Sequence, residues 1–215
     1  GSITSGVPES KYSASFDGDK DFLYLGKSND RISVGQSNVT LMCWVKPTDA
    51  ANDQYIFSNK RQRDNPTDSN ASSNLSLFIK DDSGTLKFRA IAYDNNTSHV
   101  GVNSSITVTN NQWYHIAVTV TDTTTSNNLK LYVNGTISNG NQAGGTIAMN
   151  PSDSLKTNHA CYVGQFDNTG DRYFEGLVSE LSLFDTVLTS SNILYAYNNP
   201  GINLTLNQGD YDKSS

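Results

Sequence analysis

The sequence predicts an all-β fold, a sandwich of two antiparallel sheets with one short C-terminal helix. Asn, Ser, Thr and Gly are abundant, and 11 Tyr and 8 Phe stand against only 17% charged residues. This composition suits short strands joined by polar turns better than helices. Apolar and polar residues also alternate between turn signals in residues 75–79, 86–90 and 129–133. Such alternation is typical of half-buried strands, and 215 residues suffice for one sandwich domain.

The strands and their connections can be placed along the chain. Residues 41–45, 116–120 and 177–184 are apolar in consecutive positions, which predicts central strands covered on both faces. Asp81-Asp82-Ser83-Gly84 and Asn134-Gly135 supply the residues that tight hairpin turns need. Antiparallel pairing of the strands on either side of each turn is therefore expected.

One helix is expected near the C-terminus. Thr189 or Ser190 can cap a segment that carries Ile193, Leu194 and Tyr197, and Asn199-Pro200-Gly201 then ends it. Residues 1–12 and 207–215 have little apolar periodicity and are predicted to be tails, so the folded unit is expected to span residues 13–206.

Charge and composition exclude two classes of partner. The net charge is −6, and the longest basic run is the short Lys60-Arg61-Gln62-Arg63 segment, so nucleic acid is not an expected partner. The longest apolar stretches, such as residues 41–45, are too short for a membrane helix of about 20 residues. Cys43 and Cys161 lie in apolar strands, either as buried free thiols or as a disulfide.

Several segments in a consistent order resemble the concanavalin-A-like jelly roll in its laminin-G-like form, with pentraxins as relatives. These segments are Phe16-Asp17-Gly18 with Phe22, residues 41–47, 56–58, 113–119, 131–135, 163–164, 174–181 and 189–194. The resemblance implies a jelly roll with Trp44 and Trp113 as core anchors. Family members often have Asp-Glu where this chain has Ser179-Glu180. Cys43 falls where pentraxins have half of a disulfide, but Ala117 occupies the position of the other half, so that bridge is not expected.

The sequence does not predict an enzyme. Glycoside hydrolases need two carboxyl groups facing one cleft, about 5–5.5 Å apart in retaining enzymes. The strand over residues 175–185 carries Glu180 and Asp185 at an odd separation, which places them on opposite faces. His115 is expected to be a satisfied, partly buried side chain and not a catalytic base, and residues 17–21 are interpreted as a turn because Phe22 and Ser28 break the EF-hand pattern.

Two oxygen-rich loops are the candidate calcium ligands. Asp64 and Asn65 follow the strand at residues 56–58, and Asp167 and Asn168 follow Val163-Gly164. The resemblance to pentraxins implies that acidic and amide side chains at such places hold Ca²⁺, and oxygen ligands suit this hard cation. The alternative is that these are ordinary polar loops of an Asn-rich surface.

The expected function is recognition: binding of a glycan or a cell-surface receptor, in adhesion or attachment, by an extracellular, cell-surface or virion-surface protein. Arg63, Tyr93, Arg172 and Tyr173 are the candidate ligand-binding residues, because aromatic and polar side chains near the rim suit sugar binding. The alternative is a structural, protein-interaction or oligomerisation module of a larger surface protein.

Overall fold

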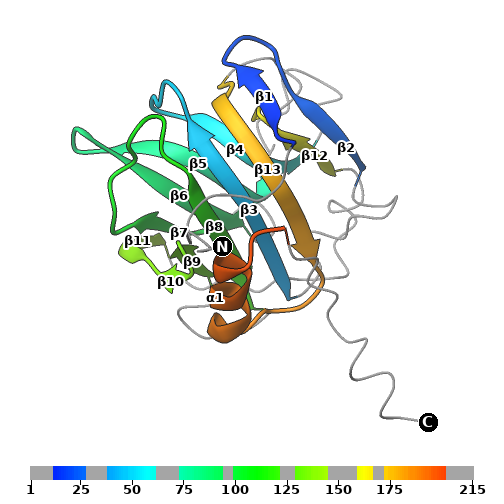
Figure 1. The fold of residues 1–215 in the computed structure, drawn as a ribbon, viewed down its shortest axis with the longest axis vertical. Coiled ribbons are helices and arrows are strands. Elements are labelled where there is room, and N and C mark those ends of the chain that lie inside the picture. The colour runs from blue at the N-terminus through cyan, green and yellow to red at the C-terminus, as the bar shows by residue number, and fades with distance from the viewer. Residues whose placement is uncertain are drawn as a thin grey trace, which may run out of the picture.

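Two antiparallel sheets lie face to face in the computed structural model (Figure 1). The structure describes residues 12–27, 38–61, 73–93, 99–121, 129–144, 159–166 and 172–201. The six-stranded sheet runs in the order β1 (Ala14–Asp17), β13 (Glu175–Phe184), β3 (Val39–Pro47), β8 (Tyr114–Val120), β9 (Leu129–Val133) and β10 (Thr136–Ile137). The seven-stranded sheet runs in the order β11 (Asn139–Gly144), β7 (His99–Ser104), β6 (Thr85–Tyr93), β5 (Ser73–Asp82), β4 (Gln54–Arg61), β12 (His159–Val163) and β2 (Leu23–Lys27). The predicted jelly-roll sandwich is confirmed.

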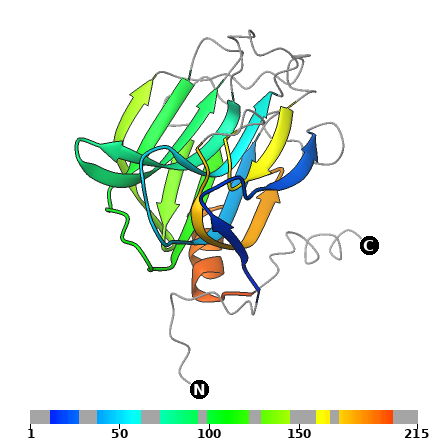
Figure 2. The same ribbon diagram turned by 90° about the horizontal axis from the view of Figure 1, so that it is seen from above.

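The main core lies between the inner faces of the two sheets, whose strands Figure 2 shows from above. Leu75, Leu77 and Ile79 of β5 point inward with no exposed surface, and Ile116 and Val118 of β8 meet them from the other sheet. Burying one such side chain contributes about 1.5–3 kcal/mol. The alternating apolar positions in the sequence therefore fixed which face of each strand points inward.

Both predicted hairpin turns form. β5 and β6 are joined through Ser83 and Gly84, whose φ angles are +57° and +83°, and β9 and β10 through Asn134 and Gly135, with φ angles of +52° and +77°. Positive φ at both central residues matches the type I′ turn, whose twist suits antiparallel strands. The turn residues thus set the register of these two hairpins.

The predicted helix is α1 (Ser190–Asn198), which lies across the outer face of the six-stranded sheet (Figure 1). Thr189 is its N-cap, and Asn192 completes a reciprocal capping box with it. Ile193 and Ala196 pack on Met42 and Tyr132 of the sheet and form a second, smaller core. In the described part of the chain, no helix has the length and apolar character needed to cross a membrane.

The two tryptophans differ from the expectation that both anchor the core. Trp44 is only 1% exposed, but it points away from the main core and lies beneath α1. Trp113 is half-buried and precedes β8, so the prediction was wrong for this residue. In β8, Tyr114 and Ile116 point inward. Trp113 has the opposite parity to these residues and lies beyond the strand end, which explains the difference.

Cys43 and Cys161 are both free and buried, so of the two alternatives the structure shows free thiols. They lie in the main core, on β3 and β12 respectively. Burial raises the pKa of Cys43 to about 12 and that of Cys161 to about 11. The side-chain amide of Asn59 donates a hydrogen bond of 2.9 Å to the sulfur of Cys161.

The sandwich has two distinct ends. One, called the turn end here, carries the β1–β2, β3–β4 and β5–β6 connections. The other, called the far end, carries the last residues of β2, β4 and β6. Any two residues expected to cooperate at a rim must lie at the same end.

Candidate functional site

Three aromatic rings gather on the outer face of the seven-stranded sheet at its β2 edge. The rings of Phe22 and Tyr24 lie 5.9 Å and 5.6 Å from the ring of Tyr162, centroid to centroid. Tyr162 is buried under its neighbours, whereas Phe22 is 45% exposed and Tyr24 is 49% exposed. These three residues are called the edge aromatics. Exposed rings of this size on a soluble domain are typical of a binding surface.

A second group of rings carries a positive charge at the turn end. The guanidinium of Arg172 lies 4.7 Å from the ring centroid of Phe166, whose ring lies 4.4 Å from that of Tyr55. Tyr55 in turn stacks on Phe78 at 4.5 Å with nearly parallel rings. A cation over an aromatic face is attracted by the ring quadrupole. The column of rings therefore supports an exposed guanidinium on this face.

Hydrogen bonds to backbone carbonyl oxygens hold the residues of this column in place. The hydroxyl of Ser58 donates a 2.6 Å hydrogen bond to the carbonyl oxygen of Phe166, and the backbone N–H of Tyr55 donates a 3.2 Å bond to the carbonyl oxygen of Arg172. Arg172 itself has a φ of +62°, a region that a residue with a side chain rarely adopts. Such strain is found preferentially at functional positions.

A polar network continues across the same face. Arg89 of β6 donates a 2.7 Å hydrogen bond to the side-chain oxygen of Asn103, and the amide nitrogen of Asn103 donates a 3.2 Å bond to Asp82. Gly101 lies beneath the guanidinium, because a Cβ at that position would be 2.8 Å from a terminal nitrogen of Arg89. The missing side chain allows Arg89 to lie along the sheet.

The predicted ligand-binding residues do not come together. Arg172 is exposed and Tyr173 is half-buried, and both lie at the turn end. Tyr93 is the last residue of β6; it lies at the far end, where it pairs with His99 of β7. Arg63 lies outside the described residues, two positions beyond the far end of β4. Of the three described residues, two therefore lie at the turn end and one at the far end.

The predicted calcium ligands, Asp64, Asn65, Asp167 and Asn168, all lie outside the described residues. The strands that precede them are antiparallel: Arg61 pairs with His159, whereas Val163 pairs with Phe57. Among the described residues, no three His, Cys, Asp or Glu side chains lie close enough to hold a metal ion.

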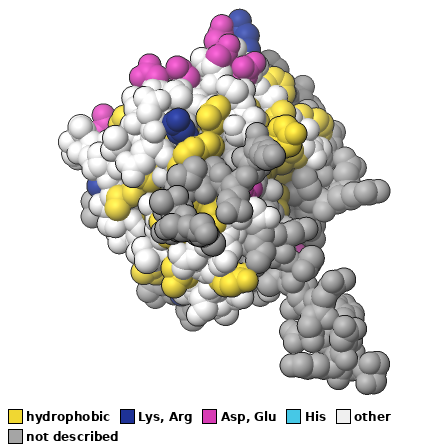
Figure 3. All heavy atoms as spheres, viewed as in Figure 1, with side chains coloured by type: hydrophobic (Ala, Val, Ile, Leu, Met, Phe, Trp, Pro, Cys, Tyr) yellow, Lys and Arg dark blue, Asp and Glu magenta, His cyan; other side chains and the backbone are white. Residues whose placement is uncertain are grey.

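Carboxylates gather at the turn end, where Figure 3 shows acidic side chains over the β1–β2 and β3–β4 connections. Asp17 and Glu175 lie directly opposite each other in the β1–β13 pair. The sequence search along single strands could not find this cross-strand pair. The carboxylate of Asp17 is turned back to accept a 2.9 Å hydrogen bond from the backbone N–H of Asp19, which stabilises the turn.

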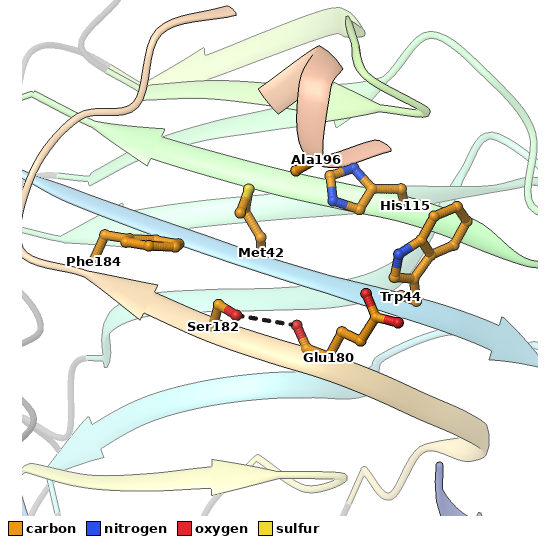
Figure 4. Close-up of a pocket in the computed structure, with 7 residues that line it drawn as sticks. All are labelled: Met42, Trp44, His115, Glu180, Ser182, Phe184 and Ala196. Atoms are coloured by element: carbon orange, nitrogen blue, oxygen red, sulfur yellow. Dashed lines mark hydrogen bonds between the residues drawn. The ribbon is translucent and has the colours of Figure 1, made fainter. Parts of the chain in front are cut away.

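A small cavity lies on the opposite outer face, between the six-stranded sheet and α1 (Figure 4). Its volume is about 30 Å³, and its lining includes Trp44, His115, Glu180 and Ala196. This volume holds about one water molecule. Tyr197 of α1 stacks on Trp44 at 5.7 Å, and the ring of His115 meets Trp44 edge-on at 5.2 Å. The cavity is too small for a sugar ring.

Two polar atoms in this region have no hydrogen-bond partner, Nδ1 of His115 and one carboxylate oxygen of Glu180. His115 is only 3% exposed, and burial lowers its pKa to about 4, so the imidazole is neutral at pH 7. His115 is thus more deeply buried than the partly buried side chain that was expected, and its Nδ1 has no partner where a satisfied side chain was expected. An ordered water is the usual partner of such atoms in a polar cavity.

Glu180 holds the chain that follows α1. Its second carboxylate oxygen accepts a 3.0 Å hydrogen bond from the backbone N–H of Gly201. Glu180 has a φ of +53° and lies in a break of the β3–β13 register between Ser179 and Ser182. Such a bulge redirects a side chain. The Glu180 carboxylate therefore helps to hold the chain after α1 through its hydrogen bond with Gly201.

Comparison with known proteins agrees with the fold. A family model described as the concanavalin A-like lectin/glucanases superfamily matches residues 17–194. No curated protein sequence matches the chain. Among solved structures, a heptameric SAP-like pentraxin from Limulus polyphemus aligns with a TM-score of 0.58 and 18% identity, over 85% of this chain and 80% of the pentraxin.

Two further structures belong to larger carbohydrate-active proteins. Domain 4 of a GH43 extracellular arabinanase from Geobacillus stearothermophilus, in complex with arabinotriose, aligns with a TM-score of 0.54 and 18% identity over 87% of this chain and 76% of that domain. A sialidase from Trypanosoma rangeli aligns with a TM-score of 0.61 and 16% identity, over 86% of this chain but only 27% of the sialidase. At these identities the likeness shows the fold alone.

The sequence interpretation missed the edge aromatics and Arg89. Phe22 was noted only as part of a family segment, and Tyr24 and Tyr162 were not selected. A usable signal was present in residues 22–25, where Phe22 and Tyr24 alternate with Leu23 and Leu25, so that both faces are apolar. The sequence could not show that β2 is an edge strand whose outer face is open.

Proposed function

Because the chain belongs to the concanavalin A-like lectin/glucanase superfamily, we propose that it is a non-catalytic carbohydrate-recognition domain that binds its glycan at the β2 edge of the seven-stranded sheet. The observation that carries the proposal is the exposure of the Phe22 and Tyr24 rings, backed by Tyr162. A flat ring offers an apolar platform to the C–H face of a sugar, while polar groups nearby fix its orientation.

Arg172 is the polar group that best complements these rings. It lies at the turn end, where β2 begins, and its exposed guanidinium is supported by Phe166. A guanidinium offers several N–H donors in one plane, which suits neighbouring hydroxyl or carboxylate oxygens. The proposed site therefore has two rings for stacking and one rigidly supported hydrogen-bond donor.

The proposal includes an extracellular or surface location and leaves calcium as a candidate cofactor. One Ca²⁺ ion is proposed to lie between the loop of Asp64 and Asn65 and the loop of Asp167 and Asn168, because oxygen ligands of this kind suit a hard cation. Calorimetric titration of Ca²⁺ into the wild-type protein and the Asp64→Ala and Asp167→Ala variants tests this. Loss of binding in both variants supports one shared ion, whereas full binding in both contradicts it.

Catalysis is not part of the proposed function. Glu180 lies in a cavity of about 30 Å³ and bonds to the backbone of Gly201, so it cannot reach a glycosidic bond. Asp17 and Glu175 are the facing carboxylates that remain to be tested. The protein should release no reducing ends from common polysaccharides. Release that disappears in Glu175→Gln would show that the domain is a hydrolase.

The test of glycan recognition compares two tyrosines with matched exposure. Tyr24 is 49% exposed on the proposed site, and Tyr195 is 51% exposed on α1, across the molecule. On a glycan array, the wild-type protein and Tyr195→Ala should bind the same sugars. Tyr24→Ala should bind them about tenfold more weakly, since stacking contributes on the order of 1 kcal/mol. Equal loss in both variants, or no binding to any glycan, contradicts the proposal.

A second candidate function is self-association, favoured by a specific apolar patch. Ile137, Leu194 and Tyr195 are exposed, and Leu194 lies against the turn before β10 at Gly135. A contiguous exposed patch of this kind is typical of interfaces. A mass that rises with protein concentration and falls to that of a monomer in Leu194→Asp would support a second copy as the partner. A monomer at all concentrations would exclude it.

A further inference from the structure

Positive charge gathers on the outer face of the seven-stranded sheet, although the whole chain carries a net charge of −6. Among the outward strand positions whose side chains are described on this sheet, three residues are cations and one is a carboxylate. These residues are Lys80, Lys87, Arg89 and Asp82. Lys80 and Lys87 lie directly opposite each other on β5 and β6, and Arg89 is two residues further along β6. Like charges placed opposite each other are destabilising unless something compensates them.

Partial compensation is visible within the protein. Lys80 forms a 3.2 Å ion pair with Asp53, and the ammonium of Lys87 donates a 3.2 Å hydrogen bond to the backbone carbonyl of Ser105. Arg89 has one described hydrogen bond, to the neutral side chain of Asn103, and no carboxylate lies within ion-pair distance of it among the described residues. A guanidinium has five N–H donors, so most of the donor capacity of Arg89 remains for a ligand.

The orientation of Arg89 is fixed by its neighbours. Asn103 must present its oxygen to Arg89, because its nitrogen is committed to Asp82. Gly101 provides the space in which the guanidinium lies along the sheet, and the ring of Phe78 occupies the position opposite Arg89 on β5. A guanidinium held in this way is preorganised, so it loses little entropy when it binds a planar anion with two parallel hydrogen bonds.

We propose that Arg89, with Lys87 beside it, binds an anionic group, a carboxylate or a sulfate, on the oligosaccharide recognised by this domain. This inference rests on the proposed glycan-binding function and specifies its ligand class. The supporting geometry is the column of contacts that leads from Arg172 through Phe166 and Tyr55 to Phe78, which pairs with Arg89 in the β5–β6 register. A chain of sugars lying along this column would meet a guanidinium at each end.

The test uses matched saccharide sets on a glycan array: uronate-containing oligosaccharides, the same oligosaccharides with their carboxyl groups reduced to alcohols, and sulfated oligosaccharides. The wild-type protein should bind members of the anionic sets and bind the reduced set at least about tenfold more weakly. The carboxylated and sulfated arms identify the anion. Binding should weaken at about 1 M salt, where the screening length is about 3 Å.

Three variants test whether the anionic group of the glycan binds at Arg89. Arg89→Gln removes the charge. Gly101→Ala keeps the charge but places a Cβ where a terminal nitrogen of Arg89 now lies, at 2.8 Å, and the flexible guanidinium can move without disturbing the sheet. Both should weaken anionic binding about tenfold or more. Lys130→Gln is the control, because it removes one exposed cation from the other sheet. It should bind as the wild-type protein does.

The outcomes separate this inference from the proposed function. If neutral glycans bind best and Tyr24→Ala abolishes that binding, the recognition site stands and the anionic ligand class is wrong. If anionic glycans bind but Lys130→Gln weakens them as much as Arg89→Gln, the attraction is non-specific and the assignment to Arg89 is wrong. If no glycan binds, both proposals fail.

Discussion

The outer faces of the two sheets carry similar side chains and use them differently. On the six-stranded sheet, Trp44 and His115 lie beneath α1 and are almost wholly buried. On the seven-stranded sheet, Phe22 and Tyr24 are about half exposed, and no described helix covers them. An aromatic and polar strand face is thus buried as a second core where a helix covers it and stays exposed where none does, and the exposed face is where we propose that glycan binds.

The covered face also explains where polar groups can be tolerated without partners. His115 is neutral at pH 7 because burial lowers its pKa to about 4, and Glu180 keeps one of its oxygens bonded to the N–H of Gly201. On the open face, Arg172 is exposed and Arg89 is half-buried. Substitutions on the covered face should therefore change stability, whereas those on the open face should change binding.

The largest expected difference concerns Trp44 and Tyr24. Trp44→Ala should lower the free energy of unfolding by about 3–5 kcal/mol, because it empties the space between the sheet and α1. Tyr24→Ala should lower it by less than about 1 kcal/mol, since that ring is half exposed. Urea denaturation of both variants measures the two values. Similar losses would show that the open face is also part of the core.

The next effect is a dependence of stability on pH that comes from His115. Its pKa is about 4 in the folded protein and about 6.5 when unfolded, so as pH falls below 6.5 the unfolded chain takes up the proton first. Stability is therefore lost as pH falls from 6.5 toward 4, by up to about 3 kcal/mol.

Denaturation curves of the wild-type protein and His115→Phe between pH 4 and 7 provide the check. As pH falls, the free energy of unfolding should decrease more in the wild-type protein than in His115→Phe. A difference that stays constant over this range would mean that His115 does not titrate as its burial implies.

A smaller effect is expected at Glu180. Replacement by Gln keeps the shape but removes the charge that strengthens the hydrogen bond from the N–H of Gly201, and should cost about 1 kcal/mol. Amide hydrogen exchange should become faster at Gly201, where the chain leaves α1, and stay unchanged in β5. Unchanged exchange at Gly201 would argue that α1 is held by its packing on the sheet and not by the bond to Glu180.

The smallest effect on stability is expected at Arg172. Arg172→Gly relieves the unfavourable φ of +62° but loses the contact with Phe166, two terms of about 1 kcal/mol with opposite signs. The melting temperature should hardly change, whereas glycan binding should weaken. A clear loss of stability with full binding would assign Arg172 to the fold and not to the site.

Much of the fold could be predicted because it depends on local patterns. Alternation in β5, β6 and β9 gave the inward faces, and Asn134-Gly135 gave a turn, since each depends on neighbouring residues alone. The prediction for Trp113 was wrong because the apolar pattern starts at this residue, one position before the first residue of β8. The start of a strand depends on its partner strand, which local sequence does not specify.

The site was harder to predict, because it is assembled from segments distant in sequence. Arg172 was selected for its type, but its support by Phe166 and Tyr55 requires β4 and the chain after β12 to be neighbours. Residue type can be read from sequence, whereas proximity of this kind cannot.

The free thiols of Cys43 and Cys161 can report when the two sheets of the sandwich separate. They lie on opposite sheets in the main core, and the raised pKa values of about 12 and about 11 leave almost no reactive thiolate at neutral pH. A thiol reagent can modify them only when the sheets separate. The rate of labelling in native buffer thus measures how often the two layers part, without any engineered probe.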